Sequence, residues 1–259
     1  LRKWYTKWYT PNNATVVIVS DIKPEQTLSL IKKYFQDIKA KKLPIRKPQK
    51  EPRRLGSKEL NFKPTVKANL PMVMIGYNTP SLITAEHKWQ PYALEVLSGV
   101  LSGGNSARLP KELVRNKQSA LQASASYDMY ARYDNQFSLF GVVNSINSMP
   151  KLKQDLLKQV KRLQQYLVSP AELKRIKNQV IAANVYEKDS VFGQAMEIGI
   201  LETIGLNYKV GINYVKQIQA ITPKQIQEVA KIYLTQNNMT SATLYPNNKS
   251  VQATIPGNK

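Results

Sequence analysis

The chain of 259 residues contains no cysteine, which excludes disulfide bonds and cysteine-ligated zinc. It contains one histidine, His87, and no second histidine at helical spacing from it. A hydrolytic zinc site takes about three protein ligands, usually histidine with a carboxylate, so the usual donors for catalytic zinc are missing. We therefore expect His87 to face solvent at the start of a helix. No apolar run reaches the roughly 18 to 20 residues of a membrane-spanning helix.

Acidic residues are also scarce, because 17 Asp and Glu stand against 38 Lys and Arg, which gives a net charge of +21. Much of the excess falls between prolines in residues 39–54, where the composition is that of an extended, solvated linker. A second group lies on a predicted helix opposite an apolar face, as is usual for a solvated helix surface. The two groups are Lys39, Lys41, Lys42, Arg46, Lys47, Lys50, Arg53 and Arg54, and Lys151, Lys153, Lys158, Lys161 and Arg162.

The charge alone does not predict a nucleic-acid partner. Neither a recognised binding motif nor an interleaving of base-stacking aromatic residues accompanies it. Binding of nucleic acid or an anionic membrane through residues 39–54 stays a third hypothesis for function. It predicts an association that weakens steeply with salt and vanishes when that stretch is neutralised.

A short pattern occurs twice in the chain, at residues 9–19 and again at residues 233–244. Both copies are typical of an aromatic residue closing a helix, then an Asn-Asn turn, then a strand. The helix before the second copy is complete, and it begins with Thr222 as N-cap and Pro223 at the first helical position. Only residues 1–9 remain of the first helix, so we expect the sequence to be part of a longer protein.

The rest of the chain predicts a mixed α+β fold, with helices segregated from a largely antiparallel sheet. The basic, proline-rich residues 39–58 are the clearest candidate for a domain boundary. Helices are predicted at about residues 25–34, 87–101, 149–167, 170–200 and 222–233, with a further helix running through Leu109, Leu113 and Val114. Strands are predicted at residues 16–19, 70–77, 120–130, 136–143 and 240–244.

Five segments resemble one family, and they occur in its order over nearly the whole chain. They are Tyr9-x-Pro11-Asn12-Asn13, the stretch from Leu101 through Gly103-Gly104 to Leu109, Leu113-Val114-Arg115, Ser169-Pro170-x-Glu172-Leu173, and Ile221-Thr222-Pro223 through Tyr233-Leu234. On these residues the chain resembles the pitrilysin/insulinase family of zinc metallopeptidases, which includes the mitochondrial processing peptidase.

The resemblance implies a domain layout. Residues 1–38 would close a first family domain, residues 39–58 would be the interdomain linker, and residues 59–259 would form a second, non-zinc domain. The family's zinc motif, H-x-x-E-H, lies in the earlier domain and does not occur in this chain. The resemblance therefore implies zinc in the longer protein with ligands outside this chain. We expect no metal site, no catalytic residue and no peptide hydrolysis from this chain alone.

The resemblance also implies candidate substrate-binding residues. In the family, an Arg-x6-Tyr pair faces the substrate carbonyl, where positioned donors stabilise the negative charge that develops on the oxygen. Arg115 matches the arginine, but Gln122 stands where the tyrosine is expected. Gly103 and Gly104 are typical of a helix end, and in the family a glycine loop at this place borders the substrate chamber. We expect Arg108 to anchor that loop rather than to contact substrate.

Two principal functions remain open. In the first, the chain is the non-zinc wall of a peptidase chamber, where it helps to bind peptide and the scissile carbonyl. In the second, it belongs to a non-catalytic homologous subunit or binding scaffold. The implied partners are a zinc-bearing domain, a second subunit in a homodimer or heterodimer, and a peptide or unfolded polypeptide. Gln122 is compatible with a protein that carries zinc and takes the Arg-Tyr pair from a partner subunit. It is also compatible with a protein that lacks zinc and serves as that partner. The compartment, bacterial periplasm or cytoplasm, is not predicted.

Overall fold

The computed structural model describes residues 1–45, 56–63 and 69–247. Five of the basic residues of the predicted linker lie outside this range, namely Arg46, Lys47, Lys50, Arg53 and Arg54. The chain divides into two compact units, one of residues 1–53 and 183–213 and one of residues 54–182 and 214–259. The predicted domain boundaries at residues 38 and 58 stay a prediction.

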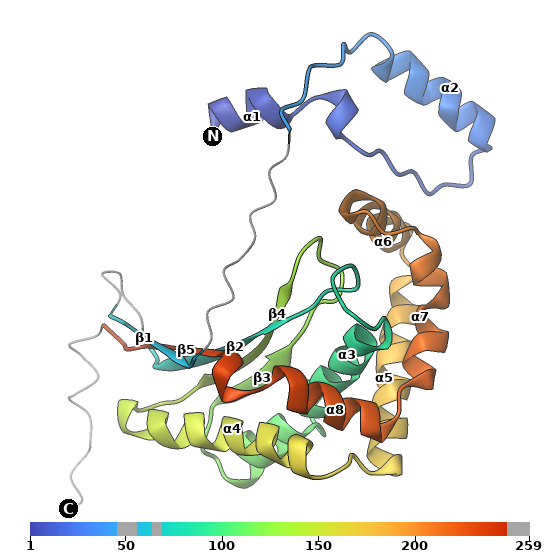
Figure 1. Ribbon diagram of the computed structural model, residues 1–259. Coiled ribbons are helices and arrows are strands. Elements are labelled where there is room, and N and C mark those ends of the chain that lie inside the picture. The colour runs from blue at the N-terminus through green and yellow to red at the C-terminus, as the bar shows by residue number, and fades with distance from the viewer. Residues whose placement is uncertain (46–55, 64–68, 248–259) are drawn as a thin grey trace, which may run out of the picture. The chain divides into compact units, whose positions relative to one another are not determined.

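The larger unit is built on a five-stranded sheet of order β1-β5-β2-β4-β3 (Figure 1). The parallel β1–β5 pair is the exception, since β2–β5, β2–β4 and β3–β4 are antiparallel. This confirms the predicted mostly antiparallel sheet. The strands are β1 (Lys58–Phe62), β2 (Met72–Thr79), β3 (Gln122–Ser126), β4 (Asn135–Val142) and β5 (Met239–Leu244).

Helices cover one face of this sheet, so the predicted α+β fold is confirmed. The covering helices are α3 (Trp89–Ser102), α4 (Met149–Gln165) and α8 (Pro223–Tyr233) (Figure 1). Val73, Ile75 and Tyr77 of β2 are buried, whereas Met74 between them is 46% exposed. Because successive strand residues point to opposite faces, this alternation places the core between the sheet and the helices.

The long helix predicted over residues 170–200 is wrong, because the chain turns at residues 188–190. It forms α5 (Pro170–Glu187) and α6 (Val191–Ile204). The Ser190 side chain accepts a hydrogen bond from the Gly193 N–H and so caps α6. A further helix, α7 (Lys209–Ala220), was not predicted at all.

The internal repeat is confirmed at its turns. Both copies contain a short 3-10 helix, η1 (Pro11–Asn13) and η4 (Gln236–Asn238). The last asparagine of each turn donates its side-chain N–H to the carbonyl five residues earlier, Asn13 to Trp8 at 2.8 Å and Asn238 to Tyr233 at 2.8 Å. Two sequence-distant segments therefore close their helices in the same way.

The strand predicted at residues 16–19 is wrong. Between α1 (Arg2–Trp8) and α2 (Pro24–Phe35), residues 14–20 have no strand assignment. Val16 and Ile18 are 52% and 49% exposed, and no ladder partner for them exists among the described residues. In the second copy β5 is flanked by β1 and β2, which supply the hydrogen-bond partners that a strand needs.

Candidate functional site

The loop after α3 requires its two glycines. The Gly103 N–H donates to the Gly99 carbonyl at 2.6 Å, and a Cβ on Gly103 would lie 2.6 Å from that same oxygen. Gly104 has a φ of +89°, a backbone conformation that side chains with a Cβ rarely adopt. The carbonyl of Gly104 then accepts from the Ala107 N–H at 3.0 Å. The helix stop expected at Gly103-Gly104 is therefore a tight, hydrogen-bonded turn.

Arg115 is joined to this loop. It lies in η2 (Pro110–Asn116), a short π-helix, and its side chain is exposed. Its Nη2 donates to the backbone carbonyl of Asn105 at 2.6 Å. The structure thus brings together three of the four predicted substrate-binding positions, with the guanidinium of Arg115 holding the loop that Gly103 and Gly104 shape.

Gln122 lies apart from that contact, at the first position of the edge strand β3. Its neighbour Ala123 is buried while Gln122 is exposed, so the Gln122 side chain lies on the sheet face opposite the helices. The connection to β3 is tight, because the Ser119 and Ala120 N–H groups both donate to the Leu113 carbonyl, at 2.8 and 3.2 Å. The hydrogen bonds of the described residues join Arg115 to the loop, and none joins it to Gln122.

Arg108 anchors the loop, as predicted. Its Nε and Nη2 donate to the two carboxylate oxygens of Glu172 at 2.9 and 2.7 Å, across 64 positions of sequence. The side chains are 16% and 21% exposed, so this bidentate pair is shielded from most solvent. Glu172 sits in the first turn of α5, where the Ser169 hydroxyl accepts from the Glu172 N–H at 3.2 Å. The loop is thereby fixed to the start of α5.

A second cluster of polar groups surrounds Glu95 in the middle of α3. The Tyr214 hydroxyl donates to the Glu95 carboxylate, and the rings of Tyr214 and Tyr92 lie 6.2 Å apart. Burial raises the pKa of Glu95 to about 7, the Tyr214 hydrogen bond opposes that rise, and Asp128 adds to it. Burial, followed by the nearby Glu95, raises the pKa of Tyr214 well above its ordinary value. Sequence reasoning missed this cluster, although a carboxylate within an apolar helical stretch could have drawn notice.

The described residues offer no site that fits catalytic zinc. His87 is exposed directly before α3, with its ring stacked on Trp89 at a centroid distance of 6.3 Å, which confirms its predicted position. Across residues 1–45, 56–63 and 69–247, no three His, Asp or Glu side chains are grouped so that they could hold a metal ion. Within the same residues, no helix is both long and apolar enough to cross a membrane.

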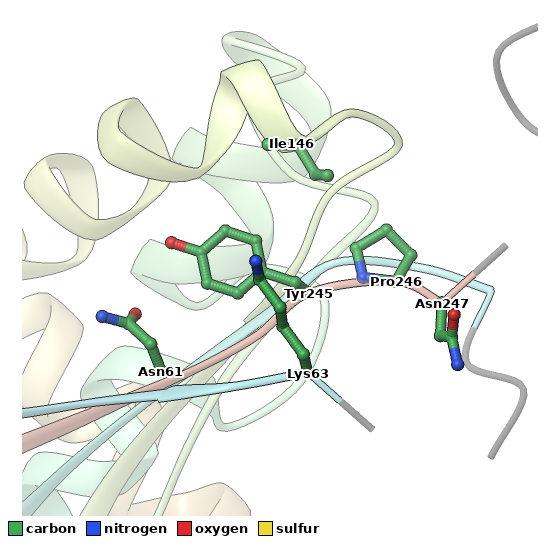
Figure 2. Close-up of a pocket in the computed structure, with 6 residues that line it drawn as sticks. All are labelled: Asn61, Lys63, Ile146, Tyr245, Pro246 and Asn247. Atoms are coloured by element: carbon green, nitrogen blue, oxygen red, sulfur yellow. The ribbon is translucent and has the colours of Figure 1, made fainter. Parts of the chain in front are cut away.

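An open pocket of about 690 Å³ lies at the ends of β1 and β5 (Figure 2). None of the predicted substrate-binding residues contributes to its lining. Its walls are formed by Asn61, Lys63, Ile146, Tyr245, Pro246 and Asn247.

The family model described as the peptidase M16 inactive domain matches residues 1–180. The chain belongs to the peptidase M16 family. This is the pitrilysin family of the predicted resemblance, which is thereby confirmed. The zinc protease PqqE of Helicobacter pylori is 28% identical over 254 residues, which cover 95% of this chain and 54% of that protein.

Solved structures agree with this assignment to M16. A protease from Helicobacter pylori has a TM-score of 0.86 at 25% identity, with 95% of this chain and 58% of that chain covered. A peptidase M16 inactive domain from Pseudomonas fluorescens shares the fold, with a TM-score of 0.70 at 13% identity over 88% of this chain and 52% of that chain. The chain thus spans about half the length of the curated relative and of these structures.

Proposed function

We propose that this chain forms the non-zinc wall of the substrate chamber of a zinc-dependent peptidase. The observation that carries the proposal is the match to the M16 inactive domain. The proposal is supported by the 28% sequence identity to a zinc protease over 95% of this chain. The zinc ligands would lie on a separate domain or subunit, and the substrate would be a peptide or unfolded polypeptide. In the proposed layout, residues 1–38 close a first family domain, residues 39–58 form the linker, and residues 59–259 form a second domain.

Arg115 would act on the scissile carbonyl. Attack of zinc-bound water places negative charge on the carbonyl oxygen, and a preorganised donor stabilises that charge. Arg115 is exposed, and its guanidinium is positioned by the Asn105 carbonyl. A guanidinium offers five N–H donors in a fixed plane, so one contact to the loop leaves donors for a ligand. Gln122 would contribute an amide donor in place of the family's tyrosine hydroxyl.

The edge strand β3 would hold the peptide backbone. β3 pairs with β4 on one side, and the end of the sheet lies on its other side. An edge of this kind can accept an extended peptide as an added strand through main-chain hydrogen bonds. Gln122 begins β3, so a peptide paired there would pass close to the substituted position.

Gln122 also supports a second function, that of a non-catalytic homologous subunit. An amide is shorter than a tyrosine side chain and supplies no aromatic wall, so half of the family's pair is altered. A subunit of this kind would keep the fold and assemble with a zinc-bearing partner, or serve as a binding scaffold without chemistry.

The test uses the native assembly that contains this chain, assayed for zinc content and for hydrolysis of an unstructured peptide with and without a chelator. The proposal predicts about one zinc per zinc-bearing domain and hydrolysis that the chelator abolishes. Arg115→Ala should lower kcat by about 100-fold, the usual cost of one lost oxyanion donor. Arg2→Ala, a change of an exposed arginine in α1, is the matched control and should leave kcat unchanged.

Two outcomes separate the functions. A metal-free, inert assembly would contradict the peptidase role and support the non-catalytic subunit. An active, zinc-dependent assembly in which Arg115→Ala has no effect would place the carbonyl donors on another chain. Gln122→Tyr adds a direct reading, because it should raise kcat only if the pair of this chain faces the substrate.

A further inference from the structure

The outer face of α4 carries a row of basic side chains that the proposed function does not use. Lys151, Lys158, Lys161 and Arg162 are all exposed. At 3.6 residues per turn, positions 151, 158 and 162 follow one another along one side of the helix, and position 161 borders them. With a rise of 1.5 Å per residue, the row is about 17 Å long.

The charge of this basic row is not neutralised by acidic neighbours. The one acidic residue of α4, Asp155, is buried and pairs with Lys117 at 2.7 Å. The remaining cation of the helix, Lys153, pairs with Glu59 of β1 at 2.9 Å. In the part of the chain that the structure describes, the ion pairs include no member of the row. Asp155 lies four residues after Lys151 and three before Lys158, but it is buried and its ion pair is with Lys117, so the four cations of the row keep their excess charge.

The basic row is mounted on a firmly packed element. Leu152, Leu156 and Leu163 on the opposite side of α4 are fully buried. α4 lies beneath the sheet in the same layer as α8, which it contacts (Figure 1). The four cations therefore project from a fixed helix, so little ordering of backbone is needed when the face meets a partner.

Two large exposed side chains follow at the end of the helix. Tyr166, the residue that ends α4, is 66% exposed and Leu167 is 49% exposed, whereas Val168 returns to the core at 2%. The apolar face of α4 is buried in the core, so attraction of the cations to anionic lipid headgroups would supply the binding, and the two exposed side chains beside them could enter the interface. Single-stranded nucleic acid instead needs aromatic residues interleaved with the cations for base stacking, and here they are grouped at one end.

We propose that this face of α4 binds an anionic lipid surface. The helix lies flat, the basic row contacts lipid phosphate groups, and Tyr166 and Leu167 enter the headgroup region. Binding of this kind is peripheral and requires no spanning helix. Lipid binding involves none of the residues of the Arg115 loop, so its test is independent of the test of the peptidase role.

The test is flotation of the full chain with vesicles of equimolar phosphatidylglycerol and phosphatidylcholine, and with vesicles of phosphatidylcholine alone. We expect binding to the anionic vesicles only, weakened by added salt. Replacing Lys151, Lys158, Lys161 and Arg162 by Gln should lower the partition coefficient by at least about 100-fold, since each cation contributes roughly fivefold. Tyr166→Ser with Leu167→Ser should weaken binding and leave the remainder more sensitive to salt.

A matched control removes four exposed cations of the same compact unit that lie outside the row, with Gln at Lys111, Lys174, Lys216 and Lys224. It should change the partition coefficient by no more than about threefold, because these cations do not belong to the contacting face of α4. Equal losses in the two variants, or no binding to anionic vesicles, would overturn the proposal. Tighter, row-dependent binding to a short DNA duplex than to the vesicles would overturn it as well. Circular dichroism checks that each variant keeps its helices.

Discussion

Tyr214 of α7 donates a hydrogen bond to the Glu95 carboxylate of α3, and so joins two helices across 119 positions of sequence. Tyr92 of α3 and Asp128, in the connection from β3 to β4, add to the polar surroundings of this pair. α7 begins in the smaller unit and continues in the larger one, where Tyr214 is its first residue. A titratable contact therefore fixes α7 to the core of the larger unit immediately after the chain re-enters it.

The raised pKa of Glu95 predicts a stability that falls with rising pH. The folded state holds the proton up to a pKa of about 7, against an ordinary value of 4.5. The folded state thus binds more protons than the unfolded state across this window, so stability is fully present below pH 4.5 and is lost as the pH rises through 7. Glu95→Gln, whose amide oxygen can still accept from Tyr214, should remove roughly 3 kcal/mol of this pH dependence. Urea unfolding at a series of pH values measures the slope. Glu86→Gln, an exposed change before α3, should leave it intact.

Tyr214→Phe removes the donor and keeps the ring. We expect a loss of about 1 to 2 kcal/mol in the free energy of unfolding, because the Glu95 carboxylate is left without this hydrogen bond. The hydrogen bond lowers the pKa of Glu95, so the variant should also shift the pH-dependent loss of stability upward. Tyr133→Phe, at a side chain that is 49% exposed, is the control. Equal effects of the two changes would argue against the contact.

Arg108→Lys should destabilise the protein by about 1 to 2 kcal/mol despite the conserved charge, because an ammonium cannot reproduce the bidentate contact. A double-mutant cycle with Glu172→Gln in chemical denaturation measures the coupling between the two residues. The control cycle pairs Lys153→Gln with Glu59→Gln, where Glu59 is 58% exposed. That surface pair should couple by no more than about 0.5 kcal/mol. A coupling as small for Arg108 and Glu172 would contradict the anchoring role.

Gly103→Ala should lower the free energy of unfolding by about 2 kcal/mol, since the new Cβ would meet the Gly99 carbonyl at 2.6 Å. The displaced loop should also loosen the Asn105–Arg115 hydrogen bond. Thermal unfolding measures the first effect. The control is Gly199→Ala in α6, where the nearest atom to a Cβ is 3.6 Å away. Because alanine is the better helix former, that change should be neutral or stabilise by up to about 1 kcal/mol.

Patterns confined to one element were predictable from the sequence. The Thr222 cap, with its reciprocal bond to Gln225, and the asparagine turns of the repeat follow from local chemistry. The break at Ser190 was also signalled, because Asp-Ser is a typical helix start, but the apolar residues on both sides favoured one long helix. The failed strand at residues 16–19 shows the limit of such patterns, since a strand depends on partners that its own residues do not specify.

The site was predictable only in part. Arg108, Arg115 and Gly103-Gly104 were selected on motif and spacing, and the first of these has its predicted anchoring role. The contact of Arg115 with Asn105 depends on how a π-helix folds back on a loop, and no periodicity encodes it. Glu95 and Tyr214 lie too far apart in sequence for any local pattern to pair them.

The order of strands in the sheet has a consequence for biosynthesis. β5 is the last of the five strands to be translated, yet it lies in the interior of the sheet between β1 and β2. Until residues 239–244 leave the ribosome, β1 has no strand to pair with. One side of β2 is also an unpaired edge until then, and β2 includes the apolar residues Val73, Ile75 and Tyr77. Such long-range pairing makes folding slow and exposes the nascent chain to aggregation. The sheet therefore closes only after β5 has emerged, and until then the unpaired edge of β2 is open to wrong pairing.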